Sequence, residues 1–365
     1  MKEKILEWII GLTGIFCIYI FLASRSLALM NFILSEKMDT ELQEFTKYGD
    51  LYYYNCINYF KENLPKQLRR FRLSEKNSSI GNAEILTFGD SFFDISFQKT
   101  LPERLLESLH VNVYSYITQD PTQANPFCTL QDSMYSHQKI PKYLIFETVE
   151  RNIPTKFDSI YDPFCGIKNI PGKLTFDKIL TTYIFKSNED GLNDLMLKRS
   201  IFTHKIYSLI STLKFDWFGY ISKMTPVYSK KPKPWLFYYK QFEDKPGGYY
   251  YKYSDKEINR YCESIEQLAK NLKEKYNLNL IFMPVPNKYS IYDRFYGDQK
   301  YSDFLPRLQN GLKSRGVKYI DLYHSFTTSQ DTLYFGTDTH WNNKGVDIAL
   351  DLLIKEMRRD SLYLN

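Results

Sequence analysis

The chain has 365 residues, of which 43% are hydrophobic and 25% are charged, and its formal net charge is +6. This composition is ordinary for a globular protein that buries a core, and the length suits one large domain or one domain with a substantial insertion. Because Lys and Arg are spread along the chain, with one dense basic stretch at 66–72, we expect no nucleic-acid partner.

The apolar stretch at 5–24 (ILEWIIGLTGIFCIYIFLAS) predicts a single transmembrane helix. No charged residue lies between Trp8 and Ala23, and Lys2 and Lys4 precede the stretch, which favours a cytoplasmic N-terminus. A cleaved signal peptide is the alternative, but its apolar region would be shorter and its cleavage site clearer. We therefore expect an uncleaved signal-anchor, with the rest of the chain outside the cytoplasm.

Beyond this segment, residues 25–80 are predicted to form a juxtamembrane helical segment, and residues 81–360 a single domain. Residues 154–253 interrupt that domain with an aromatic-rich insertion that lacks a clear strand and helix rhythm. The predicted strands of the domain are 83–88, 111–116, 142–149, 278–283 and 317–323, and the predicted helices are 102–109, 254–272, 304–316 and 345–357.

This alternation of strands and helices predicts an α/β three-layer sandwich with a mainly parallel sheet. Ligands in such folds bind at the carboxyl ends of the strands. Gly89, Asp90 and Ser91 directly follow the first predicted strand, and Asp338 and His340 lie between the last strand and the last helix. Two distant parts of the chain are thus expected to meet at one edge of the sheet.

The residues at this edge suit nucleophilic catalysis. A serine hydroxyl is a weak nucleophile at neutral pH, so Ser91 would need a base, and that base would need a group that fixes its tautomer. His340 and Asp338 can supply both functions. The five cysteines match no zinc pattern, we expect neither metal nor cofactor, and Cys128 with Cys165 would be the pair for any disulfide.

The stretch FGDSF (88–92), followed far downstream by DTHWNNKG (338–345), resembles the SGNH hydrolase superfamily. The form DTHWN is similar to the branch that contains alginate O-acetyltransferases and related bacterial polysaccharide O-acetyltransferases. The stretches 141–153 (PKYLIFETVERNI) and 283–295 (MPVPNKYSIYDRF) also fit that branch. The resemblance implies Ser91 as nucleophile, His340 as base and Asp338 as its partner.

The resemblance also implies residues that bind the oxyanion or the substrate. Asn152, with Arg151 beside it, is the candidate in the first stretch, and Lys288 and Tyr292 are candidates in the second. The alternatives are an internal ion pair of Arg151 with a neighbouring glutamate, and a purely structural loop around Lys288 and Tyr292. The glycine of the second SGNH block is missing here, since residues 114–123 read YSYITQDPTQ.

The function that follows is a membrane-anchored, extracytoplasmic O-acetyltransferase of the bacterial cell envelope, acting on a cell-surface polysaccharide. By the resemblance, a multipass membrane acyltransferase would deliver the acetyl group. The alternatives are a glycan acetylesterase and a degenerate SGNH scaffold that binds glycan. Trp235 and Tyr249 of the insertion are expected to stack on sugar rings, although core packing explains such residues equally well.

Overall fold

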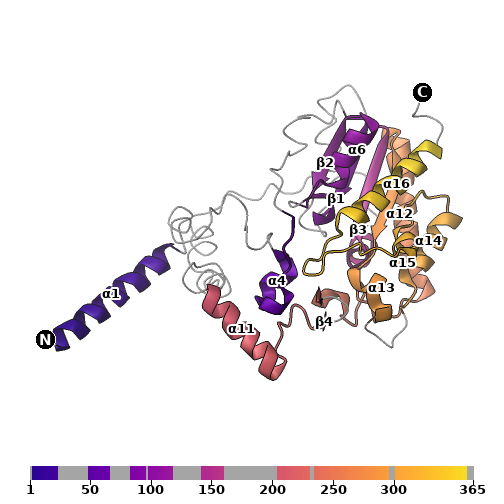
Figure 1. The fold of residues 1–365 in the computed structure, drawn as a ribbon. Coiled ribbons are helices and arrows are strands. Elements are labelled where there is room, and N and C mark those ends of the chain that lie inside the picture. Colours follow the sequence, from indigo (N-terminus) through magenta and orange to yellow (C-terminus); the bar gives the residue numbers. More distant parts are fainter. Residues whose placement is uncertain are drawn as a thin grey trace. The chain divides into compact units, whose positions relative to one another are not determined.

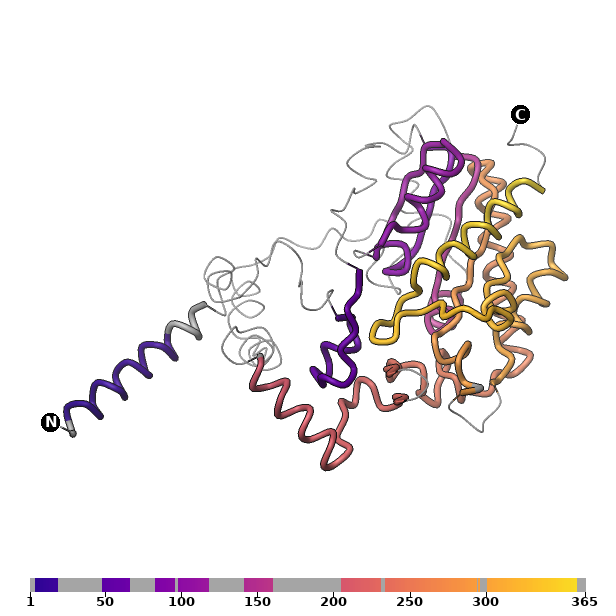
Figure 2. The backbone as a smooth tube through the Cα atoms, in the orientation of Figure 1, coloured from indigo at the N-terminus to yellow at the C-terminus, as the bar shows by residue number. Residues whose placement is uncertain are grey.

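A computed structural model describes residues 2–23, 48–65, 83–95, 98–117, 141–159, 204–230, 234–295 and 301–359 (Figures 1 and 2). The chain divides into two compact units. Unit 1 comprises Met1–Asn63 and Asn169–Ser222, and unit 2 comprises Leu64–Lys168 and Lys223–Asn365. The boundaries expected from the sequence, with an insertion at 154–253, stay a prediction.

Unit 2 contains a parallel sheet of four strands in the order β2-β1-β3-β6. The strands are β1 (Ile85–Gly89), β2 (Val113–Ile117), β3 (Tyr143–Val149) and β6 (Asn279–Val285). Every residue of β1 and β3 is buried. Near-continuous apolar runs are typical of strands that helices cover on both faces, which is why these segments could be recognised from the sequence. The predicted α/β class with a mainly parallel sheet is confirmed.

The order of the strands places helices on both faces of this sheet. From β1 the chain passes through α6 (Leu101–Leu109) to β2 on one side, and from β3 it passes through α12 (Asp255–Tyr276) to β6 on the other. Because such crossovers are right-handed, connections that run in opposite directions put α6 and α12 on opposite faces. Helix α16 (Asn343–Arg359) packs beside α6, and α14 (Phe304–Ser314) packs on α12 (Figure 1).

Local signals set the helix starts. Thr100 and Glu103 form a capping box at α6, and Ser254 and Glu257 form another at α12. The predicted strand at 317–323 is wrong in its second half. It is reduced to a parallel bridge between Phe282 and Tyr319, and α15 (Leu322–Thr328) follows at once. The cause is Asp321, whose side chain accepts a hydrogen bond from the backbone N–H of His324 and so begins a helix.

Part of the aromatic stretch belongs to the core of unit 2. Strands β4 (Val227–Ser229) and β5 (Trp235–Phe237) form an antiparallel pair. Trp235 is 5% exposed and packs against Tyr292, with ring centroids 4.2 Å apart. Tyr249 is 2% exposed and packs edge-on against Tyr289. The expectation that Trp235 and Tyr249 stack on glycan is therefore wrong, because both rings are used in packing.

Short helical elements follow the strands and complete unit 2. They are η4 (Ser91–Phe93), η5 (Glu150–Asn152), α8 (Ile153–Phe157), η8 (Tyr239–Gln241), α13 (Lys288–Tyr292) and η9 (Asp293–Phe295). Elements η4, η5 and α13 begin directly after or close to the carboxyl ends of β1, β3 and β6, where the candidate site residues are found.

Unit 1 contains α1 (Lys2–Ala23), α4 (Asp50–Asn55), η2 (Asn58–Phe60) and α11 (His204–Phe218). Within the described part of the chain, no helix combines the length and the apolar character that a membrane crossing requires. Most of the predicted juxtamembrane segment, and the cysteine pair Cys128 and Cys165, lie outside the described residues.

Candidate active site

Ser91 lies at the point where β1 ends and turns into η4. The Asp90 carboxylate accepts a hydrogen bond from the Phe92 N–H and so begins this short helix. The Ser91 side chain is exposed, while those of Phe92 and Phe93, which directly follow it in the turn, are buried. The turn thus holds its two aromatic side chains in the core and presents the serine hydroxyl to solvent.

Gly89 permits this turn by having no side chain. A Cβ atom at Gly89 would lie 2.6 Å from Oε2 of Glu147 and 2.7 Å from the ring of Phe93. Both distances are shorter than any ordinary contact. The close approach of β1 to the β3 side chain Glu147 therefore requires glycine directly before Asp90 and Ser91.

A buried tryptophan fixes the loop that carries His340. Trp341 has no exposed surface, and its ring packs edge-on against Phe92, with centroids 5.5 Å apart. The Phe335 N–H donates to the His340 carbonyl, and Trp341 pairs with Tyr334. Asn342 then accepts hydrogen bonds from the N–H groups of Lys344 and Gly345 and so caps the start of α16.

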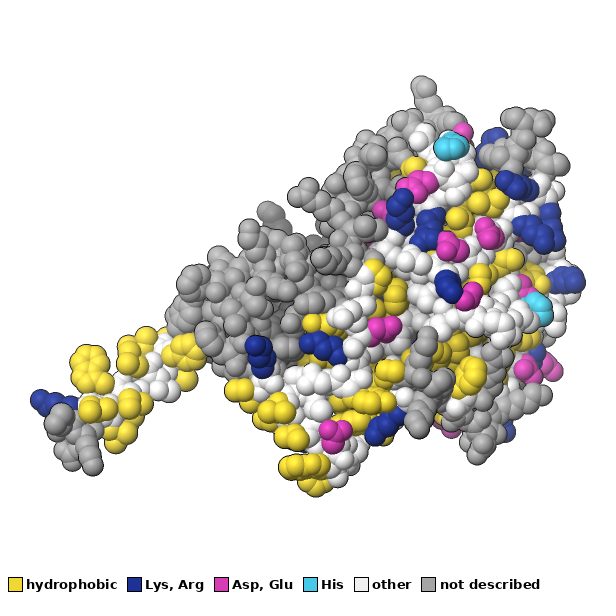
Figure 3. All heavy atoms as spheres, viewed as in Figure 1, with side chains coloured by type: hydrophobic (Ala, Val, Ile, Leu, Met, Phe, Trp, Pro, Cys, Tyr) yellow, Lys and Arg dark blue, Asp and Glu magenta, His cyan; other side chains and the backbone are white. Residues whose placement is uncertain are grey.

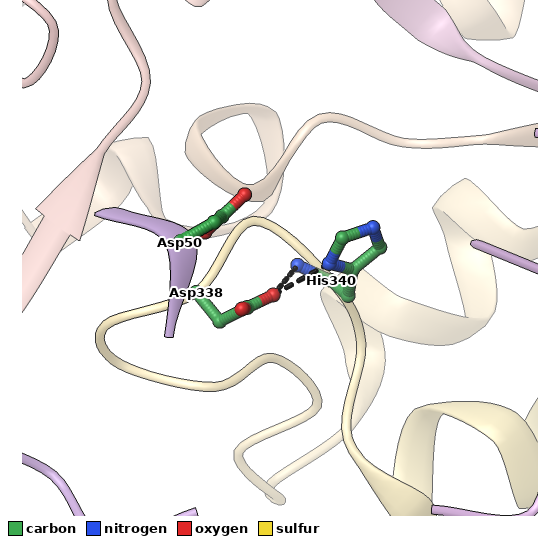
Figure 4. Close-up of side chains that lie close together, drawn as sticks. All are labelled: Asp50, Asp338 and His340. Carbon is green, nitrogen blue, oxygen red and sulfur yellow. Dashed lines mark hydrogen bonds and ion pairs between the residues drawn. The ribbon is translucent and has the colours of Figure 1, made fainter. Parts of the chain in front are cut away.

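The two segments bring Ser91, His340 and Asp338 into one hydrogen-bonded chain. Nε2 of His340 lies 2.8 Å from Oγ of Ser91. Nδ1 of His340 lies 2.5 Å from Oδ1 of Asp338, and Figure 4 shows this second contact. The same carboxylate oxygen accepts the backbone N–H of His340 at 2.9 Å, so the Asp338 side chain is held in place by the turn itself. The Phe92 ring lies against the imidazole, with centroids 4.9 Å apart.

Lys288, at the start of α13, is buried and hydrogen-bonds to the loop that carries Asp338. Its Nζ donates hydrogen bonds to the carbonyls of Leu236 (2.9 Å), Gly336 (2.7 Å) and Asp338 (3.2 Å). The side chain is 1% exposed, and the rings of Trp235 and Phe237 lie near the ammonium group. The three N–H groups of the ammonium thus bind three backbone carbonyls, and the ammonium connects β5 to the loop that carries Asp338.

Tyr292 also supports the loop. Its hydroxyl accepts a hydrogen bond from the Leu333 N–H at 2.8 Å, and the ring is 4% exposed. Lys288 and Tyr292 were expected to bind substrate on the basis of the resemblance, with a structural loop as the alternative. The contacts described here are those of the structural alternative.

Asn152 and Arg151 lie in η5, which directly follows β3. Nδ2 of Asn152 donates to Oδ2 of Asp90 at 3.3 Å. Asn152 therefore contacts the residue that directly precedes Ser91. Arg151 donates to Oδ1 of Asn287 at 3.4 Å, and its guanidinium lies over the ring of Tyr238. The structure thus brings Asn152 to the Ser91 turn and directs Arg151 toward the segment after β6.

The glutamates near Arg151 have other partners than the ion pair considered from the sequence. Glu150 accepts the N–H of Asn287 at 2.8 Å and the hydroxyl of Tyr301 at 2.5 Å. Glu147 accepts the Asp90 N–H at 2.9 Å. Burial raises the pKa of the Glu150 carboxyl, and the hydrogen bonds from Tyr301 and Asn287 offset part of that increase in pKa.

Glu147 is a buried acid directly beneath the turn that carries Ser91. The sequence predicted no role for Glu147 in the site. Burial raises the pKa of the Glu147 carboxyl well above its usual range, the nearby Asp90 carboxylate raises it further, and Lys156 lowers it in part. The signal that could have found it is a charged residue inside the otherwise apolar strand YLIFETV.

Comparison with known proteins gives a family match for part of the chain. Residues 232–365 match the family model described as SGNH hydrolase-like domain, acetyltransferase AlgX. The matched range includes Lys288, Tyr292, Asp338 and His340, and Ser91 lies before it. No curated protein matches the chain. The resemblance seen in the sequence is thereby confirmed for this part of the chain: residues 232–365 are similar to the SGNH hydrolase-like domain of acetyltransferase AlgX.

Proposed function

We propose that this protein transfers acetyl groups to the hydroxyls of a cell-surface polysaccharide through an acetyl-Ser91 intermediate. The observation that carries the proposal is the hydrogen-bonded chain Ser91–His340–Asp338, with 2.8 Å between serine and imidazole and 2.5 Å between imidazole and carboxylate. The match of residues 232–365 to an acetyltransferase domain supports acetyl as the group that is transferred.

The roles of the side chains follow from the geometry. Oγ of Ser91 attacks the carbonyl carbon of the acetyl donor while its proton passes to Nε2 of His340, which then returns the proton to the leaving group. In the second half, His340 takes the proton of a sugar hydroxyl, whose oxygen attacks the acetyl carbon. The bond from that carbon to Oγ of Ser91 then breaks, and His340 returns the proton to Oγ. Asp338 keeps the proton of the neutral imidazole on Nδ1, so that Nε2 is the acceptor.

The negative charge on the carbonyl oxygen needs donors in both halves of the reaction. Asn152 is the side-chain donor that we propose. Its amide carries two N–H groups, one of which binds Asp90, and the second would serve the oxyanion. Asp90 would thus hold both the serine turn and the oxyanion donor, which makes it a positioning residue in this proposal.

The location and the partners are part of the same proposal. The uncharged run from Trp8 to Ala23 supports an N-terminal anchor with the catalytic unit outside the cytoplasm. A multipass membrane acyltransferase would pass acetyl groups across the bilayer to Ser91. Fractionation of cells into membrane and soluble parts, combined with protease access to intact cells, tests this arrangement.

A glycan acetylesterase is the second candidate, and one observation favours it. Ser91 is exposed, and Trp235 and Tyr249 of the aromatic stretch, which could have excluded water from the site, are buried in the core. With water instead of a sugar hydroxyl in the second half, the same residues would hydrolyse the acetyl-enzyme.

Turnover of p-nitrophenyl acetate with and without a polysaccharide acceptor separates the candidates. Under the proposed function, the acceptor accelerates p-nitrophenol release and becomes acetylated. Release that no acceptor accelerates supports the esterase, and the absence of any reaction that depends on Ser91, tested with Ser91→Ala, supports a glycan-binding scaffold.

A further inference from the structure

Helix α11 in unit 1 carries two hydroxyl side chains inward and a row of large apolar side chains outward. Ser208 is 5% exposed, and its hydroxyl lies 2.8 Å from the carbonyl of Cys56 and 2.9 Å from Oδ1 of Asn58. One turn further, the Thr212 hydroxyl accepts the Asn58 N–H at 3.0 Å. The side of the helix that faces the protein is therefore held largely by hydrogen bonds.

One aromatic contact completes this inward side. Phe215 is buried and packs against Phe60 and Tyr59 of the segment around η2. A helix on the surface of a water-soluble protein normally shows the reverse arrangement, with its apolar stripe inward and its polar side chains in water.

The outward side of α11 is an apolar stripe. Ile206 (58% exposed), Leu209 (55%), Ile210 (45%) and Trp217 (72%) point away from the protein, and the half-buried Leu213 continues the row. These residues recur at intervals of three and four, which places them on one helical face. Figure 3 shows hydrophobic side chains gathered over this helix. A contiguous apolar surface of this kind is characteristic of an interaction site.

The residues around the stripe indicate what it contacts. Phe218 and Tyr220 extend the row of exposed aromatic residues at the end of the helix, and the exposed charges on the helix are Lys205 and Lys214, with Asp216 as the acid. Trp and Tyr beside Lys are the residues that concentrate at the interface between lipid and water. The excess of positive charge complements anionic lipid headgroups.

The length of α11 excludes a membrane crossing by this helix. Its 15 residues extend about 22 Å, which is less than the roughly 30 Å of a bilayer core. A helix of this length with an apolar face, an aromatic end and flanking lysines is suited to lie in the plane of the interface, with the stripe among the upper acyl chains.

We propose that α11 is a membrane-surface helix, which docks the stripe Ile206, Leu209, Ile210, Leu213 and Trp217 onto an anionic bilayer. This docking surface is separate from the Ser91 site, which belongs to unit 2, and it does not depend on the acetyltransferase proposal. It would give the protein a lipid contact in addition to any contact made by α1.

Tryptophan quenching by lipid tests the proposal in the full chain. Trp8→Phe removes the tryptophan of α1, and of the three that remain, Trp235 and Trp341 are buried at 5% and 0% exposure, so Trp217 reports on the stripe. The protein is incorporated into vesicles of phosphatidylcholine and phosphatidylglycerol, with or without bromine on the acyl chains. We expect brominated chains to quench the Trp8→Phe protein, and most of this quenching to be absent from the Trp8→Phe, Trp217→Phe protein.

A matched pair of polar substitutions addresses the stripe itself. Leu209→Gln with Ile210→Gln, in the Trp8→Phe protein, should reduce the quenching of Trp217, whereas Lys270→Gln on α12 should leave it unchanged. Equal Trp217 fluorescence in brominated and ordinary vesicles would overturn the proposal. Association of two copies through the stripe in the absence of lipid would also overturn it. Such association would appear as concentration-dependent sedimentation that the two glutamine substitutions abolish.

Discussion

The ammonium group of Lys288 donates a hydrogen bond to the backbone carbonyl of Asp338, with 3.2 Å between the two atoms. Lys288 follows β6, whereas Asp338 lies on the loop before α16, so this contact joins the candidate triad to the sheet. The other two hydrogen bonds of the same ammonium, to Leu236 and Gly336, close the connection to β5. The position of the Asp338 carboxylate therefore depends on a buried cation that does not itself reach Ser91.

Lys288→Met should lower both the stability and the turnover of the protein. The apolar side chain removes one donor from each of three backbone carbonyls, of which that of Gly336 keeps the N–H of Leu236. We therefore expect the free energy of unfolding to fall by about 2–5 kcal/mol. In the fraction that folds, kcat for p-nitrophenyl acetate should fall more than KM rises, because Asp338 is displaced while the approach to Ser91 is unchanged. Lys270→Met on α12, where the side chain is 57% exposed, is the control and should behave as the wild type. A stable and fully active Lys288→Met protein would show that the loop holds its geometry without the ammonium.

The choice of base predicts a difference between two histidines. His340→Ala should abolish formation of acetyl-Ser91, and Asp338→Asn should reduce its rate by about 10³–10⁴-fold, because the imidazole loses the acceptor that fixes its tautomer. His324 lies on α15, where its backbone N–H donates to the Asp321 side chain. Ser91 of the His324→Ala protein should therefore be acylated at the normal rate. Mass spectrometry of the Ser91 peptide after brief exposure to p-nitrophenyl acetate measures all three variants. An adduct that persists in His340→Ala and vanishes in His324→Ala would reverse this assignment.

The sequence was sufficient to predict the strands β1, β3 and β6, because their apolar runs are buried on both faces. It also indicated that Ser91 and His340 meet, although of the two strands on which this prediction was based only β1 is present, and 317–323 contributes a single bridge at Tyr319. The role of Lys288 was not predictable in this way, since its three acceptors are backbone atoms that lie 48 to 52 residues away along the chain. The same is true of Trp235 and Tyr249, since an aromatic residue looks the same in sequence whether it packs in a core or faces a ligand.

The buried acid Glu147 predicts a particular dependence of stability on pH. Burial raises the pKa of this carboxyl well above its usual range, so the folded protein favours the protonated form. Its contribution to stability is therefore fully present below the unfolded pKa of about 4.3 and is lost as the pH rises through the higher folded pKa. Glu147→Gln cannot ionise, so the stability of the wild type relative to this variant should fall as the pH increases from 4 to 8.

Urea unfolding at each pH measures this difference, and the Asp90 N–H keeps an acceptor in the glutamine amide. Glu274→Gln, at an exposed position on α12, is the control, and its difference from the wild type should stay flat over the same range. A flat difference for Glu147→Gln as well would mean that the Glu147 carboxyl has an ordinary pKa and that the burial described here is relieved in solution.

Gly89→Ala should displace the serine turn without touching the triad directly. The new methyl group would lie 2.6 Å from Oε2 of Glu147 and 2.7 Å from the Phe93 ring, so β1 or these two buried side chains must shift, at a cost of about 1–3 kcal/mol. Acylation of Ser91 should slow with the fold retained, whereas Gly11→Ala in α1, where a Cβ atom would meet no atom within 4 Å, should change neither quantity. A double-mutant cycle identifies the cause: with Glu147→Ala already present, Gly89→Ala should cost at least about 0.5 kcal/mol less, because one of the two colliding groups is gone. Strict additivity of the two substitutions would assign the whole effect to Phe93 and remove Glu147 from the reason that glycine precedes the candidate nucleophile.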